Sequence, residues 1–80
     1  MKVLKAWEKR SDEHRVCYAV LTDEGLRLGE TIDDDRHQDT AGEISIEQFL
    51  RGGYQRELAA AFGEDVLGEA IALARGIPRG

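Results

Sequence analysis

Residues 14–32 have the sequence HRVCYAVLTDEGLRLGETI, and this pattern predicts a β-hairpin. The first half, residues 14–22, is apolar on both faces in its middle, which is typical of a central strand. A short polar loop at 23–25 ends in Gly25, and glycine tolerates the positive φ that tight hairpin turns often need. In residues 26–32 apolar side chains alternate with polar ones, so a second strand with one apolar face follows.

The segment before this hairpin is predicted to add a strand to the sheet, and the segment after it is predicted to leave the sheet. Residues 2–9 alternate in the manner of a strand and carry apolar side chains on both faces. Residues 33–43 change to a run of acidic and small residues, which predicts an acidic loop. A short fourth strand at 39–45 is the alternative for the end of this run.

Two capping signals agree on where the first helix begins. Gln48 follows Ser45 at the spacing of a capping box, and Ile44 and Phe49 have the spacing of a hydrophobic staple. The apolar periodicity beyond this point predicts helices over about residues 46–52, 54–62 and 64–75.

The predicted fold is α+β, with an antiparallel meander of three or four strands followed by two or three helices packed on one face. The chain has 80 residues, which is enough for one small domain spanning 1–80. Such a domain has a thin core with no room for a large cofactor site, so we expect no cofactor.

Charge narrows the choice of partner. The formal net charge of −5 disfavours direct binding to nucleic acid or to an acidic membrane surface, since both require clustered Lys and Arg. Residues 22–43 hold eight acidic and two basic residues, which predicts an acidic edge along the third strand and its flanking loops. This edge is either a solubility surface or a docking surface for a basic partner.

The lengths of the apolar runs and the number of cysteines indicate where the protein is located. The longest apolar run, residues 16–21, has six residues and is too short to span a bilayer, and residues 1–10 lack the continuous apolar core of a signal peptide. Cys17 is the only cysteine and cannot form an internal disulfide. We therefore expect a cytoplasmic protein.

Two groups of residues have the chemistry of a catalytic or metal site, and both have simpler explanations. A run of carboxylates with one imidazole suits divalent cations but lacks the EF-hand spacing, so a solvated loop explains it better: Asp33, Asp34, Asp35, His37 and Asp39. Cys17 lies in the most apolar segment, where cysteine is usually a small buried hydrophobe rather than a nucleophile paired with His14 or His37. We expect neither an enzyme nor a metal site.

Trp7 has two interpretations. It is the only tryptophan of the chain, and in a small domain a tryptophan usually packs against the core. Tryptophan is also enriched among the residues that anchor protein interfaces. The sequence alone leaves both interpretations open.

Several short segments resemble a known family: residues 1–5 (MKVLK), Ala19-Val20 followed by Gly25, Ser45 with Glu47-Gln48, and the amphipathic segment 67–75. They are similar to segments of the small anti-CRISPR proteins that Pseudomonas phages encode against type I-F surveillance complexes, in particular those that bind the backbone of the complex. Chain length and the order of strands and helices agree as well.

The resemblance implies a protein inhibitor that works in the cytoplasm of a bacterial host. Members dock on the backbone subunits and stop target DNA from pairing with the guide. The family's contact surface uses two tyrosines and a glutamate, and these positions fall on Ala6 (next to Trp7), Leu21 and Asp33 in this sequence. The acidic position therefore keeps an acidic residue, and both tyrosine positions carry other residues.

The acidic edge and the resemblance together define the expected partner-binding residues: Trp7, Leu21, Glu30, Asp33, Asp34 and Asp35. The expected partner is a protein with a basic surface, a subunit of a type I CRISPR surveillance complex. The alternative is an antitoxin-like or regulatory module that neutralises a basic nucleic-acid-binding partner, such as an RNA-cleaving toxin.

Overall fold

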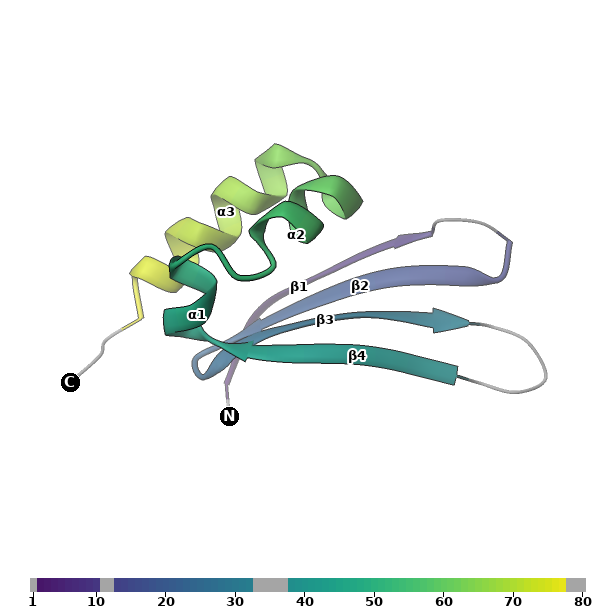
Figure 1. Ribbon diagram of the computed structural model, residues 1–80, viewed down its shortest axis with the longest axis horizontal. Coiled ribbons are helices and arrows are strands. Elements are labelled where there is room, and N and C mark those ends of the chain that lie inside the picture. Colours follow the sequence, from purple (N-terminus) through teal and green to yellow (C-terminus); the bar gives the residue numbers. More distant parts are fainter. Residues whose placement is uncertain (1, 11–12, 33–37, 78–80) are drawn as a thin grey trace.

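The computed structural model of the protein describes residues 2–10, 13–32 and 38–77. Four strands form one antiparallel sheet in the order of the chain: β1 (Val3–Arg10), β2 (Arg15–Thr22), β3 (Gly25–Ile32) and β4 (Gln38–Ser45). Three helices follow and lie over one face of the sheet: α1 (Ile46–Leu50), α2 (Gln55–Phe62) and α3 (Glu64–Arg75) (Figure 1). The predicted α+β meander with helices on one face is confirmed.

Strand β4 corrects the prediction of a loop over residues 33–43. It begins at Gln38 and pairs with β3 along its whole length, from Gln38 opposite Ile32 to Ser45 opposite Gly25. Acidic residues and glycine disfavour strands, but pairing with a neighbouring strand overrides such weak preferences. The alternative of a short fourth strand was therefore the right one, although the strand is longer than predicted.

The strand register divides the sheet into two faces, because residues directly opposite each other point to the same side. The helix-covered face carries Lys5, Trp7, Lys9, Cys17, Ala19, Leu21, Leu26, Leu28, Glu30 and Ile44. The helix-free face carries Val3, Ala6, Glu8, Arg10, Val16, Tyr18, Val20, Arg27, Gly29, Thr31 and Glu43.

The hydrophobic core lies between the helix-covered face and the helices. Its buried members are Ala19, Leu21 and Leu26 of the sheet and Ile46, Phe49, Leu58, Ala70 and Ala74 of the helices. Burying one leucine or phenylalanine side chain contributes about 1.5–3 kcal/mol, so this small set supplies much of what holds the helices in place. The sheet extends beyond the helical layer toward the β1–β2 and β3–β4 connections (Figure 1).

The turn between β2 and β3 depends on Thr22 and Gly25. The buried Thr22 hydroxyl accepts hydrogen bonds from the backbone N–H groups of Glu24 and Gly25, both at 3.1 Å. A Cβ atom on Gly25 would collide with the backbone carbonyl of Ile44 in β4. Gly25 is therefore needed for the close approach of two strands, and not for the positive φ suggested by the sequence.

The predicted capping box at the start of α1 is present. The Ser45 hydroxyl accepts a hydrogen bond from the Gln48 N–H at 3.1 Å, and the Gln48 side-chain oxygen accepts one from the Ser45 N–H at 3.0 Å. Helix α1 ends at Leu50, earlier than predicted, because Gly52 adopts a φ of 117° that no helix permits.

Tyr54 precedes α2 as its N-cap residue and adopts the left-handed conformation, with a φ of 62°. Its hydroxyl lies over Gly42 of β4, where any side chain would displace it. The side-chain amide of Gln55 donates a hydrogen bond of 2.8 Å to the Phe49 carbonyl and so ties α2 back to the end of α1. These contacts fix the path that carries α2 back across the sheet.

Candidate partner-binding surface

The charged residues of the sheet are segregated by strand. Strands β1 and β2 carry four basic residues and one acidic residue: Lys5, Lys9, Arg10, Arg15 and Glu8. Strands β3 and β4 carry three acidic residues and one basic residue: Glu30, Asp39, Glu43 and Arg27. Because β1 and β4 are the two outer strands, the sheet has a basic half (β1–β2) and an acidic half (β3–β4).

Glu30 lies at the junction of these halves, on the helix-covered face. Its carboxylate is 3.4 Å from the Arg15 Nε atom, and both side chains are partly exposed. An exposed ion pair of this kind contributes less than about 1 kcal/mol. The structure therefore leaves this predicted site residue at the surface, next to a basic neighbour.

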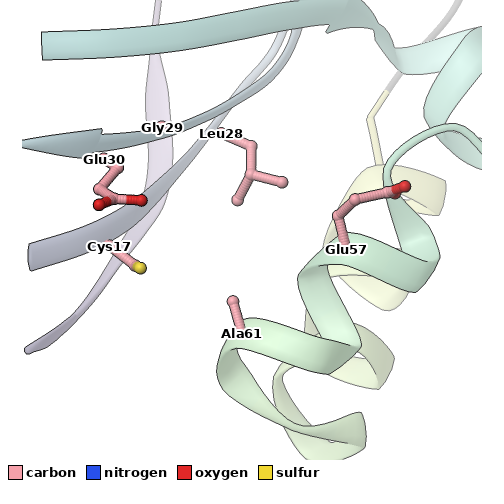
Figure 2. Close-up of a pocket in the computed structure, with 6 residues that line it drawn as sticks. All are labelled: Cys17, Leu28, Gly29, Glu30, Glu57 and Ala61. Atoms are coloured by element: carbon pink, nitrogen blue, oxygen red, sulfur yellow. The ribbon is translucent and has the colours of Figure 1, made fainter. Parts of the chain in front are cut away.

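A hollow of about 320 Å³ opens beside Glu30, where the sheet extends past α2. Its lining comes from β2, β3 and α2: Cys17, Leu28, Gly29, Glu30, Glu57 and Ala61. Figure 2 shows Cys17 and Glu30 on the sheet side, while Glu57 directs its carboxylate away from Glu30. The two carboxylates do not converge, so the hollow lacks the arrangement of a carboxylate pair that shares a proton or a metal ion.

Trp7 is half-buried and packs against the core from the helix-covered face. Its indole N–H donates a hydrogen bond of 3.1 Å to the Glu69 carboxylate of α3. The Lys5 ammonium donates to both oxygens of the same carboxylate, at 2.8 and 2.7 Å. In the structure Trp7 thus helps to join β1 to α3.

The Glu69 carboxyl is more acidic than that of an ordinary glutamate. The hydrogen bonds from Lys5 and then from Trp7 hold the pKa of its carboxyl below the usual range, and they outweigh the opposing effect of desolvation. Both donors favour the charged carboxylate, which keeps this link between strand and helix intact at neutral pH.

Leu21 corrects the predicted site. It is completely buried in the core, so no partner can contact it while the protein stays folded. The resemblance also implied Ala6, but this residue lies on the helix-free face, opposite to the face of Leu21. The two positions therefore cannot belong to one contact surface.

Asp33, Asp34 and Asp35 lie outside the described residues, as does His37 of the proposed metal run. Within the part of the chain that the structure describes, no three His, Cys, Asp or Glu side chains cluster as metal ligands would. Cys17 is a half-buried free thiol at the rim of the hollow. None of the described helices is long and apolar enough to cross a membrane.

Comparisons of the chain with protein-family models, with curated proteins and with solved structures gave no match.

Two residues of this surface were missed from the sequence. Glu43 lies in β4 on the helix-free face; it was counted in the acidic edge but was not among the predicted site residues. Glu57 reaches the hollow only because α2 folds back over the sheet, and nothing in the local sequence of α2 signals that contact. The charge count over residues 22–43 was the signal that could have singled out Glu43.

Proposed function

We propose that this protein is an inhibitor that binds a type I CRISPR surveillance complex and blocks recognition of target DNA. The observation that carries the proposal is the segregation of acidic residues into β3 and β4. The resemblance of the chain to small phage anti-CRISPR proteins supplies the class of target. In this proposal the protein acts by occupying a surface and carries out no reaction.

The physical basis is competition for positive charge. A complex that holds DNA must present basic side chains to the phosphates, and a guide–target duplex lies in a positively charged channel. An acidic surface is attracted to the same side chains, and complementary potentials speed association. The acidic half of the sheet supports this mode of binding. Glu30 lies on its helix-covered face and Glu43 on its helix-free face, so a partner contacts both only by enclosing the β4 edge of the sheet.

The charge segregation also suggests an orientation. Because the basic half of the sheet is repelled by a basic groove, the protein would approach with β4 leading and β1 trailing. Asp33, Asp34 and Asp35 connect β3 to β4 in the chain, so they belong to the same half by sequence.

The direct test is a pull-down of purified type I complexes of several subtypes by the tagged protein. One arm adds guide-complementary DNA first, and the other adds it afterwards. We expect stoichiometric binding to the free complex, loss of later DNA loading, and weaker binding when the DNA is already in place. Binding to no complex, or binding that leaves DNA loading unchanged, would overturn the proposal.

A charge reversal tests the acidic half. Glu43→Lys should weaken binding about fivefold to tenfold, because an attraction becomes a repulsion of similar size. Glu64→Lys makes the same change at the exposed first residue of α3 and should alter binding less than about twofold. Equal losses in the two variants would exclude the acidic half as the contact surface.

The variant with Asp33, Asp34 and Asp35 all changed to Lys is expected to lose more affinity than Glu43→Lys, since three charges are reversed. A triple variant that inhibits as well as the parent protein would contradict the mechanism.

A further inference from the structure

A pocket of about 420 Å³ lies where the start of β1, the turn between β2 and β3 and the end of α3 come together. Figure 1 shows these three segments at the same end of the molecule. Glu30 and the hollow beside it belong to the other end of β3. Sites for small molecules usually have volumes of roughly 300–1,000 Å³, so this second pocket is large enough for a small ligand.

The wall of the pocket is apolar and already formed. Leu4 of β1, Leu73 of α3 and Ile77 after α3 are partly buried and pack against the hydrophobic core. Ala72 completes this wall at an exposed position of α3. Because its side chains are held by the core, the wall can receive the apolar part of a ligand without a rearrangement of the protein.

Two residues of opposite charge, Lys2 and Asp23, line the same pocket. The backbone N–H of Lys2 donates a hydrogen bond of 3.1 Å to the Asp23 carboxylate, and the Asp23 N–H donates one of 3.0 Å to the Lys2 carbonyl. This reciprocal contact holds the two residues next to each other. Within the described part of the chain no acidic group forms a salt bridge with the Lys2 ammonium.

These neighbouring charges favour a ligand that carries both signs of charge close together. An α-amino acid has its ammonium and its carboxylate on one carbon atom, and its side chain leaves from the same atom. The pocket also lies at the end of α3, where the helix dipole is negative, so the helix adds to Asp23 in attracting an ammonium group. A ligand with a carboxylate alone is repelled by Asp23, and a ligand with an amine alone is repelled by Lys2.

We propose that this pocket binds a free α-amino acid with an apolar side chain, such as leucine. Lys2 binds the carboxylate, Asp23 binds the ammonium group, and the wall of Leu4, Leu73 and Ile77 receives the side chain. Both charged residues are exposed, so each ion pair contributes little and the expected dissociation constant lies in roughly the millimolar range. The proposal does not depend on the inhibitor function, since it uses none of the residues of the acidic half.

The test is a titration of the intact, unmodified chain with L-leucine, followed by the NMR shifts of the backbone amides. We expect saturable changes that cluster on Leu4, Asp23, Leu73 and Gly76, which surround the pocket. Changes that do not saturate, or that cluster elsewhere in the molecule, would overturn the proposal.

Two analogues of leucine test the two charges on the same unmodified protein. The anion 4-methylpentanoate lacks the ammonium group, and the cation 3-methylbutylamine lacks the carboxylate. Each should bind at least about fivefold more weakly than leucine, because one attraction is lost and one repulsion remains. An analogue that binds as tightly as leucine would exclude the paired recognition by Lys2 and Asp23.

A pair of alanine substitutions tests the location of the site. Ala72→Phe places a ring at the wall of the pocket and should abolish the saturable changes. Ala60→Phe adds the same ring at an exposed position of α2 and should leave the binding of leucine unchanged. Binding that survives Ala72→Phe, or that both variants lose equally, would show that leucine binds elsewhere.

Discussion

The two faces of the sheet differ in what covers them, although β2 is apolar on both. On one face Ala19 and Leu21 are completely buried beneath the helices. On the other face Val16, Tyr18 and Val20 are half-buried beside charged neighbours. The comparison teaches that apolar character alone does not locate the core of so small a domain. The core forms where the helices can reach, and the apolar side chains of the other face stay outside it.

Substitutions at two adjacent residues of β2, one on each face, provide the strongest test of this difference. Leu21→Ala should cost about 2–5 kcal/mol of unfolding free energy, because it leaves a cavity in the core. Val20→Ala, one residue away on the helix-free face, should cost about 1 kcal/mol or less. Urea unfolding followed by circular dichroism measures both values.

The expected stability of the whole domain makes this difference visible. A single core of this size supplies about 3–5 kcal/mol, so Leu21→Ala should lose most of its stability while Val20→Ala keeps most of it. Equal losses for the two variants would show that the faces are not distinguished by burial.

Breaking the capping box of α1 should lower the unfolding free energy by a smaller amount, and it affects only the helices on the covered face. Ser45→Ala removes the hydroxyl that accepts the Gln48 N–H and should lower the unfolding free energy by about 1 kcal/mol. Ser45→Asp keeps an acceptor at this position and should retain most of the stability. Thermal unfolding of the two variants checks the prediction, and a full loss in Ser45→Asp would contradict it.

A substitution that strengthens the helical layer should raise the unfolding free energy instead of lowering it. Gly68 lies within α3 at an exposed position, and a Cβ atom there would meet no other group. Gly68→Ala should raise the unfolding free energy by about 0.5–1 kcal/mol, since alanine favours the helix and restricts the unfolded chain. Gly25→Ala is the contrasting variant and should be destabilising, because its Cβ meets the Ile44 carbonyl.

The smallest expected effect depends on pH and concerns the link between β1 and α3. Since the folded pKa of Glu69 is lowered, its stabilisation is complete above the usual pKa of a glutamate and is lost as the pH falls through the lowered value. Glu69→Gln should therefore be less stable than the parent protein at neutral pH, and the difference should vanish in acid. Urea unfolding followed by Trp7 fluorescence at several pH values measures this difference. A difference that persists in acid would rule out the charge of Glu69 as its cause.

The sequence was sufficient for features that depend on near neighbours. The capping box needs only Ser45 and Gln48, and the three predicted strand ranges differ from β1, β2 and β3 by at most one residue at either end. The acidic character of the β3–β4 region followed from simple counting, because charge does not depend on which way a side chain points.

Features that depend on distant segments could not be predicted. Alternation in β2 cannot tell which face is buried when both are apolar, so the inward position of Leu21 was not foreseen. The close approach of Ile44 to Gly25 and of Glu57 to the hollow beside Glu30 arises only when separate elements pack. The same limit hid the role of Glu69, which contacts Trp7 across a separation of 62 residues.

That long separation has a consequence for how the chain folds. Each strand pairs with its neighbour in sequence, so the meander can form from short loops whose closure costs little entropy. Lys5 and Glu69 are 64 residues apart, and joining them closes nearly the whole chain. We therefore expect the docking of α3 on β1 to come late in folding, after the hairpins. Substitutions at the Lys5–Glu69 link should then speed unfolding and leave the folding rate almost unchanged.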